Sequence, residues 1–187
     1  MSRRQSRKLA APDADEAGPD ADPHAVARAI CLRLLTSRAR TRSELATALR
    51  KRDVPEDVAA SVLDRFGQLG FIDDEAFAHA WVASRQAGRG LAGRALAQEL
   101  RQRGVADDVA RAAIGTMDPD AETAKARELV GRRLAAMSSV PTEARYRRLT
   151  GMLARKGYPG ALASRVVKEA LAGHLPEQLD DGGVIEG

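Results

Sequence analysis

Cysteine is nearly absent from this sequence. The 187 residues contain a single one, Cys31, so neither an internal disulfide nor a cysteine-rich zinc site can form. Cys31 lies between Ile30 and Leu32 in an apolar stretch, where a free cysteine commonly acts as a small buried hydrophobe. We therefore expect Cys31 to be a core residue and not a redox centre.

Aromatic residues are also scarce, at 3% of the chain, and β-branched residues are few. Alanine and leucine, both strong helix formers, are abundant instead, so the composition predicts an all-α protein. No apolar run approaches the length of a membrane span, and residues 1–4 lead into no hydrophobic signal core. We expect a cytoplasmic protein.

Motifs typical of catalysis are missing as well. No glycine-rich loop ends in Lys-Ser or Lys-Thr to hold a nucleotide phosphate, and His24, His79 and His174 lack metal-ligand spacing. The acidic run at residues 73–75 could suggest a metal site, but at an expected helix start such acids cap free N–H groups and offset the helix dipole. We expect no catalytic residue, no cofactor and no metal ion.

Apolar residues recur at helical spacing along most of the chain. Turn residues separate these stripes: Thr41 with Glu44 forms a capping box, and Asp118 precedes a proline at a first helical position. The pattern predicts nine helices, at residues 24–38, 42–52, 55–68, 74–86, 91–103, 106–116, 119–137, 142–156 and 159–172.

Three similar turns divide the predicted helices into repeats. Residues 49–59, 100–110 and 153–163 each end a basic helix, turn, and restart on an apolar residue. That residue recurs after 51 and then 53 positions, as Val54, Val105 and Tyr158, and such a period is typical of stacked helical modules. We predict three tandem three-helix repeats in an elongated, curved array, at 24–70, 71–117 and 118–173, between disordered tails at 1–23 and 174–187, the second of them acidic.

Charge is distributed unevenly along the sequence. The chain carries a net charge of +4, but its two ends together are net acidic, so the repeats are more basic than the whole. Cations concentrate on the second helix of each repeat and its flanks, which indicates either a solvated face or a surface for a polyanion. We favour the polyanion surface and expect it to comprise Arg42, Arg50, Lys51 and Arg52, then Arg89, Arg94, Arg101 and Arg103, then Arg145, Arg147, Arg148, Arg155 and Lys156.

Three stretches carry a likeness to a known family. They are residues 70–78 (Gly-Phe-Ile-Asp-Asp-Glu-Ala-Phe-Ala), residues 99–105, and the basic-glycine-aromatic turn at 155–158. In this order and spacing they resemble the RecX family of RecA recombinase regulators, over about residues 25–173. Asp53 departs from the resemblance, because the family often has glycine in the first turn.

The resemblance implies a non-catalytic protein that binds RecA, particularly its filament on single-stranded DNA. Such proteins restrain the recombinase, ATPase and coprotease activities of RecA and are thought to lie in the filament groove. Contacts to RecA protein or to its DNA both fit, as do capping of filament ends and blockade of the groove. Some members also bind DNA directly, and we expect this chain to act as a monomer.

Two other classes of protein fit a chain of three-helix modules. In a helix-turn-helix transcription factor the third helix of a module would enter the major groove. Here those helices open with acids, Glu56 and Asp57 in the first repeat and Asp107 and Asp108 in the second, which would face DNA phosphates. This disfavours a reader of DNA sequence, while a helical adaptor with another partner stays open.

Overall fold

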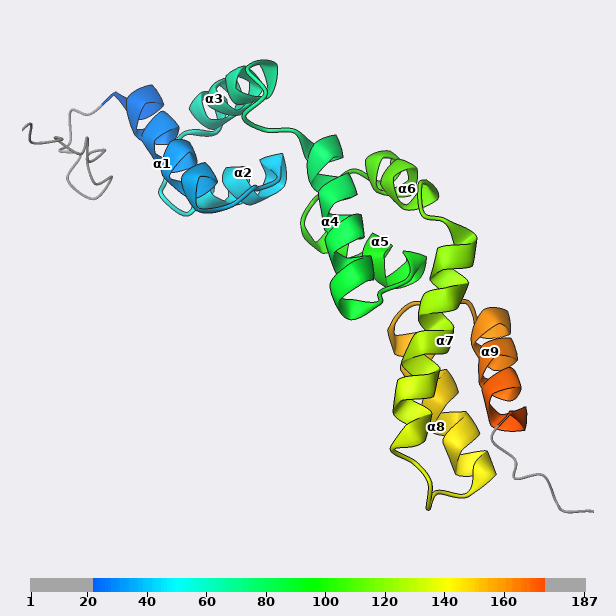
Figure 1. Cartoon of the computed structure of the whole chain (residues 1–187). Helices are drawn as coiled ribbons and strands as arrows, with labels where there is room; N and C mark the ends of the chain where they lie inside the picture. The colour runs from blue at the N-terminus through cyan, green and yellow to red at the C-terminus, as the bar shows by residue number, and fades with distance from the viewer. Residues whose placement is uncertain (1–21, 174–187) are drawn as a thin grey trace, which may run out of the picture. The chain divides into compact units, whose positions relative to one another are not determined.

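A computed structural model describes residues 22–173, and within them the chain forms nine α-helices and no strand (Figure 1). The all-α class and the helix count are confirmed, with every helix end within about three residues of its predicted place. The tails expected at 1–23 and 174–187 lie outside the described residues, except that Asp22 caps the first helix and Pro23 begins it. The helices are α1 (Pro23–Ser37), α2 (Arg42–Arg50), α3 (Glu56–Gln68), α4 (Asp74–Arg89), α5 (Gly93–Gln102), α6 (Asp107–Gly115), α7 (Pro119–Ala135), α8 (Thr142–Arg155) and α9 (Gly160–Ala172).

The helices begin where local side-chain chemistry satisfies their free N–H groups. The Thr41 hydroxyl accepts from the backbone N–H of Glu44 at 3.1 Å, as the capping box predicts. The Asp73 carboxylate accepts from Ala76 N at 2.8 Å and so caps α4. Asp118 caps α7 in the same way ahead of a proline at its first position.

The turn that marks each repeat has the same hydrogen bonds in all three copies. Val54 N, Val105 N and Tyr158 N each donate to the carbonyl of the leucine five residues earlier, at 3.1–3.2 Å. The residue before each of them, Asp53, Gly104 or Gly157, has a positive φ. These are the bonds of a Schellman motif, which ends a helix on one left-handed residue. The repetition seen in sequence is therefore a repeated backbone structure.

The first repeat has a core of its own, made where α1, α2 and α3 contact one another. Leu45 and Leu49, four residues apart on α2, are fully buried against both neighbours. Cys31 is a free, fully buried member of this core, as predicted. The other buried members are Ala27, Ile30, Val58, Ala59, Val62, Leu63, Phe66 and Ile72.

The third repeat forms a second core in which α7, α8 and α9 contact one another. Leu149 and Leu153 on α8 occupy the positions that Leu45 and Leu49 hold in the first repeat, and are equally buried. Ala92, which precedes α5, also belongs to this core. The remaining buried members are Ala126, Leu129, Val130, Leu134, Met137, Tyr158, Ala163, Val166 and Val167.

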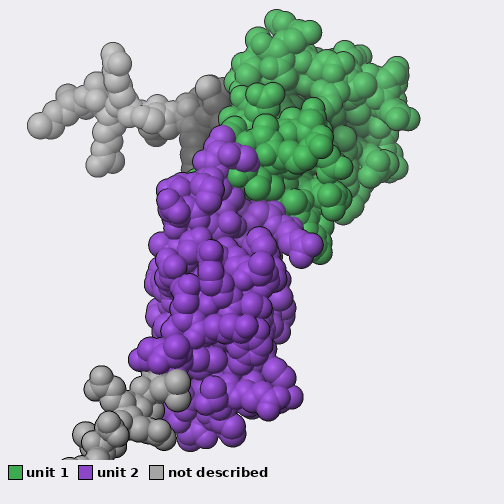
Figure 2. Space-filling view, turned by 90° about the vertical axis from the view of Figure 1, so that its right-hand side faces the viewer, with its two compact units in different colours: residues 1–83, 97–114 green, residues 84–96, 115–187 purple. Residues whose placement is uncertain are grey.

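The described chain divides into two compact units, coloured separately in Figure 2. One contains the residues up to Ala83 together with Ala97–Ile114, and the other contains Ser84–Leu96 together with the residues from Gly115 onward. The division passes through α4 and α5, so the second repeat contributes to both units. Within residues 22–173 no helix is both long enough and apolar enough to cross a membrane.

Burial of Cys31 predicts slow thiol chemistry in the folded chain. Desolvation raises the pKa of the Cys31 thiol to about 11, so near pH 8 the reactive thiolate is roughly a hundred times rarer than in the unfolded chain. We expect alkylation by iodoacetamide to be slower by at least this factor in buffer than in concentrated urea, when both reactions are followed by mass spectrometry. Equal rates would contradict a buried Cys31.

Candidate functional site: the repeat junctions and the exposed arginines

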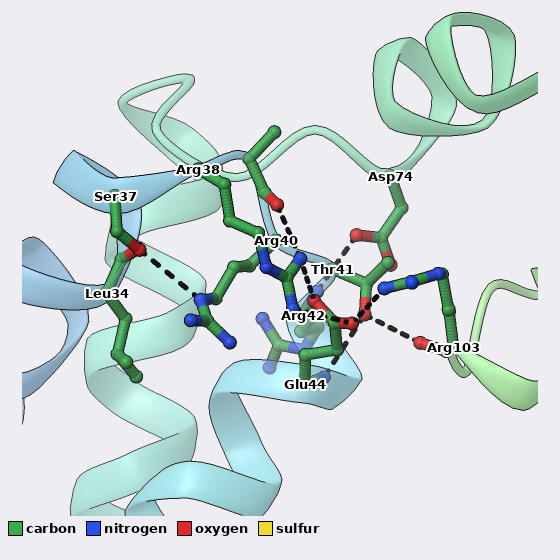
Figure 3. Close-up of polar contacts among 10 residues, drawn as sticks. Leu34, Ser37, Arg38, Arg40, Thr41, Arg42, Glu44, Asp74 and Arg103 are labelled. Carbon is green, nitrogen blue, oxygen red and sulfur yellow. Dashed lines mark hydrogen bonds and ion pairs between the residues drawn. The ribbon is translucent and has the colours of Figure 1, made fainter. Parts of the chain in front are cut away.

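The second repeat is attached to the first at the start of α2 (Figure 3). The Thr41 hydroxyl, which caps α2, also donates to the backbone carbonyl of Arg103 at 2.6 Å. Thr41 is fully buried, with 0% of its surface exposed. Because both roles of the hydroxyl are satisfied there, its burial leaves no polar atom unpaired.

A carboxylate from the second repeat completes the same helix start. Asp74, the first residue of α4, accepts from the backbone N–H of Arg42, the first residue of α2, at 2.9 Å. That N–H has no partner inside its own helix. The local capping predicted for the acidic run at residues 73–75 is correct for Asp73 but incomplete for Asp74, which caps another helix. Among residues 22–173 no group of three or more His, Cys, Asp or Glu side chains is placed to hold a metal.

The side chain of Arg103 lies at the centre of this first junction. Its guanidinium pairs with Glu44 on α2 and stacks 3.8 Å from the centre of the Trp81 ring on α4. The Trp81 indole N–H in turn donates to Glu99 on α5 at 2.9 Å. A cation held between a carboxylate and an aromatic face is well suited to join helices.

Glu44 is the anion on which this junction depends. Its two carboxylate oxygens accept from Arg38 at 3.0 and 3.2 Å, and one also pairs with Arg103. Partial burial raises the pKa of Glu44, but the hydrogen bond and charge of Arg38, with the charge of Arg103, outweigh that effect and lower the pKa below 4.5. Glu44 is therefore held in its charged form.

The junction between the second and third repeats has the same design. The backbone N–H of Gly93, the first residue of α5, donates to the Glu122 carboxylate in the first turn of α7 at 3.3 Å. The backbone N–H of Ala92 donates to the Lys156 carbonyl at 2.8 Å. Gly93 corresponds to Arg42, Ala92 to Thr41, and Lys156 to Arg103 in the repeat register. The second and third repeats therefore each supply two bonds to the start of the second helix in the repeat before them.

Side chains of the third turn strengthen the second junction. The Lys156 ammonium donates to the Arg89 carbonyl at the end of α4. The buried Tyr158 hydroxyl donates to the Gly90 carbonyl at 3.2 Å. Desolvation, with the charges of Glu122 and Glu128, raises the pKa of Tyr158 to about 12, so its phenol remains a donor.

The turn glycines lie directly against the preceding repeat. A Cβ at Gly157 would be 2.4 Å from the backbone N of Ala95, and one at Gly104 would be 2.2 Å from the Cβ of Ser43. Their φ angles of 89° and 73° are also left-handed. Asp53 in the first turn has a φ of 55° but an exposed side chain, so it meets only the backbone requirement, which Asp tolerates better than most residues.

Several cations predicted to face a polyanion have partners within the structure. Arg103, whose side chain is 26% exposed, and Lys156 hold the two junctions. Arg145 donates to the carbonyls of Ser138 and Val140 in the loop before α8. Two more are paired but exposed: Arg42 with Asp64 at 2.7 Å, and Arg101 with Asp107 at 3.3 Å. Such exposed pairs contribute little to stability.

The other predicted cations lie at the surface. They are exposed on or beside the second helices, as Arg50, Lys51, Arg52, Arg89, Arg94, Arg147, Arg148 and Arg155. In the third repeat the structure brings Arg147, Arg148 and Arg155 around one hollow with Arg133 of α7. Sequence reasoning missed Arg133 because it considered second helices and their flanks. A second basic segment near the end of α7, at residues 132–133, is the signal that could have found it.

Family comparisons place one match on each three-helix segment. The models described as the first, second and third three-helix domains of RecX match residues 27–66, 73–114 and 120–167. The chain belongs to the RecX family. The RecX resemblance inferred from the turn and the residues 70–78 is thereby confirmed.

Curated relatives agree over most of their length. The chain is 59% identical over 160 residues to the "Regulatory protein RecX" of Thermobifida fusca (strain YX), covering 86% of each chain. It is 52% identical over 172 residues to that of Streptomyces coelicolor, covering 91% of this chain and 92% of the relative. Homologues of this chain are thus named as regulatory proteins.

Solved structures share the fold. A crystal structure of RecX from Lactobacillus salivarius aligns with a TM-score of 0.74 over 80% of this chain and 97% of that one, at 19% identity. A second crystal structure, of a regulatory protein RecX, aligns with a TM-score of 0.71 over 79% of this chain and 72% of that one, at 23% identity. The RecX helical fold therefore persists at low sequence identity.

The lowered pKa of Glu44 predicts a pH-dependent contribution to stability. A depressed carboxyl pKa stabilises the folded state above the unfolded value near 4.5, and that contribution is lost as the pH falls through the lower folded pKa. We expect Glu44→Gln to cost about 1–2 kcal/mol at pH 6 and much less at pH 3. Urea unfolding followed by the fluorescence of Trp81, the single tryptophan, measures both. If the variant and the unmodified chain differ in unfolding free energy by the same amount at pH 6 and pH 3, the role of Glu44 is contradicted.

The close approach at Gly157 predicts that alanine is not tolerated there. A Cβ would meet the backbone of α5 and force a left-handed alanine, so we expect Gly157→Ala to reduce the free energy of unfolding by about 2 kcal/mol or more. Gly131→Ala is the matched control, because Gly131 lies inside α7 with open space around its Cβ. Alanine should stabilise that helix by roughly 0.5–1 kcal/mol. Similar effects at the two sites, measured by circular dichroism melts, would argue against the junction.

Proposed function

We propose that this RecX-family chain binds the RecA recombinase in the cytoplasm, above all RecA assembled on single-stranded DNA. Its effect is to restrain the ATPase, recombinase and coprotease activities of RecA. The observation that supports this most is the RecX match on all three repeats, together with 59% identity over 160 residues to a regulatory protein RecX. The family match therefore extends over all three modules and is not confined to one of them.

The proposed mechanism is binding without catalysis. The carboxylates and carbonyls at the repeat junctions already accept hydrogen bonds from the neighbouring repeat. What each repeat offers outward is a set of exposed cations on its second helix, such as Arg50, Arg94 and Arg147. Guanidinium groups bind carboxylates and phosphates with paired hydrogen bonds. A monomer in the filament groove would present these cations to RecA, its DNA, or both.

Inhibition of the DNA-dependent ATPase of RecA is the direct test. We expect the purified chain, titrated against RecA on a fixed amount of single-stranded DNA, to lower the rate of ATP hydrolysis, while the chain alone hydrolyses none. The RecA should come from the same organism as the chain, and hydrolysis is measured with a coupled spectrophotometric assay.

The controls separate contact with RecA from removal of its DNA. Inhibition that persists when the DNA is raised to a large excess indicates contact with RecA or its filament. Inhibition that disappears under the same conditions indicates DNA sequestration and contradicts the proposal. An unchanged rate at several-fold excess of the chain over RecA would also contradict it. Gly131→Ala, which alters no junction or exposed cation, should inhibit as the unmodified chain does.

A further inference from the structure

A hollow on the third repeat is lined almost entirely by arginine. Arg133 near the end of α7 and Arg147, Arg148 and Arg155 along α8 surround it, with Met152 as the apolar lining residue. All four arginines are exposed, and none of them forms an ion pair with any of residues 22–173. Four like charges around one space repel one another, at a cost that nearby anions remove. These five residues, the arginine hollow, therefore have no counter-charge in the described part of the chain.

Helix chemistry accounts for only two of the four arginines. Arg133 and Arg155 lie in the last turns of α7 and α8, where a cation offsets the helix dipole. Arg147 and Arg148 lie beyond the first turn of α8 and well before its end, so the dipole does not stabilise them. Their accumulation beside one space therefore indicates a surface for an anion.

The sequence after α9 is acidic. Residues 174–187 contain no lysine and no arginine. Their acids equal the arginines of the hollow in number and are Glu177, Asp180, Asp181 and Glu186. Leu179 directly precedes two of these acids, so the segment joins an apolar side chain to adjacent carboxylates. The hollow offers the complement, because Met152 lies among guanidinium groups.

The end of α9 lies within reach of the arginine hollow. In the third repeat α7 and α9 run in the same direction (Figure 1), and Arg127 of α7 pairs with Glu169 of α9 at 3.3 Å. Arg133 lies about 9 Å beyond Arg127 along α7, and α9 ends at Ala172, shortly after Glu169. From Ala172 to Asp180 an extended chain spans up to roughly 26 Å, more than twice the separation of about 9 Å between packed helices. The acids can therefore reach the hollow from the end of α9.

We propose that the acidic segment 174–187 binds the arginine hollow of its own chain. Each carboxylate can accept paired hydrogen bonds from one guanidinium group, and Leu179 can cover Met152. Because the segment is tethered, its effective concentration at the hollow is in the millimolar range without any partner. This inference goes beyond the proposed function, because it concerns one chain and requires no RecA.

A hollow covered in this way discriminates between anions. An external anion must first displace the segment, so its apparent affinity falls with the fraction of hollows that are open. A single acidic side chain or an isolated phosphate makes too few contacts to displace several carboxylates, whereas a dense row of anions replaces them all. The acidic segment therefore excludes weak anionic ligands from the third repeat.

A nitroxide on the segment tests the contact directly. Gly182→Cys supplies the attachment site, since the native Cys31 is fully buried. We expect the label to broaden the backbone amide NMR signals of Arg148 and Met152 in the full chain. Sodium chloride at about 1 M, where the Debye length is about 3 Å, should restore these signals. Broadening that is absent at low salt, or unchanged at high salt, would overturn the proposal.

Two matched double variants separate this contact from net charge. Asp180→Asn/Asp181→Asn removes two charges from the segment and should restore both signals. Glu75→Gln/Asp108→Asn removes two exposed charges from the other compact unit and should leave the broadening as it is. The same response from both variants would show an effect of net charge and contradict the contact.

Binding of inorganic tripolyphosphate measures how far the segment covers the hollow. By isothermal titration calorimetry we expect Asp180→Asn/Asp181→Asn to bind this anion about fivefold more tightly than the unmodified chain, as a millimolar effective concentration implies for a segment of about millimolar intrinsic affinity. Glu75→Gln/Asp108→Asn should bind it as the unmodified chain does. Equal gains by the two variants, or no gain by the first, would argue against a covered hollow.

The location of the contact and the molecule that makes it complete the test. Arg147→Gln/Arg155→Gln should abolish the broadening, and unchanged broadening would exclude the hollow as the site. A mixture of nitroxide-labelled chain with isotope-labelled chain that carries no nitroxide should show none. Broadening in that mixture would assign the segment to a second copy and overturn the intramolecular contact.

Discussion

A helix begins with backbone N–H groups that its own turns cannot satisfy, and in α2 and α5 the first of these N–H groups is bound by a carboxylate of the next repeat. Arg42 N is bound by Asp74, and Gly93 N by Glu122. The residue before each of them donates to a backbone carbonyl in the turn that ends the second helix of the next repeat. The Thr41 hydroxyl donates to Arg103, and the Ala92 N–H donates to Lys156. Because unpaired buried N–H groups are costly, neighbouring repeats are joined by backbone requirements as well as by apolar packing.

The junctions also explain why the compact units differ from the repeats. The start of α4 and the turn after α5 contact the first repeat, through Asp74 and Arg103. The end of α4 and the start of α5 contact the third repeat, through Gly90 and Gly93. The second repeat is therefore hydrogen-bonded to both of its neighbours in sequence. The second repeat is one module by its sequence period, but its hydrogen bonds divide it between the two compact units.

Helix positions could be predicted from sequence because caps and Schellman turns are local: Thr41 with Glu44, or Gly104 with Val105, are a few residues apart. The junctions could not be, because a carboxylate such as Asp74 looks the same whether it caps its own helix or one 32 residues away. The same limit applies to the basic surface. Arg101 and Arg103 are two positions apart in sequence, yet one is a surface residue and the other is stacked on Trp81. Only tertiary contacts separate these roles.

The direction of the junctions has a consequence for how the chain acquires its structure during translation. Thr41 receives its carbonyl partner from a residue 62 positions further along, so at 5–20 residues per second the ribosome needs roughly three to twelve seconds to deliver it. During that interval the Thr41 hydroxyl at the start of α2 lacks its Arg103 partner. The Ala92 N–H before α5 later lacks its Lys156 partner in the same way. A nascent first repeat is therefore less stable than the same repeat in the finished protein. Each newly made repeat supplies hydrogen-bond partners to the repeat made before it, so the repeats gain stability in the order of their synthesis.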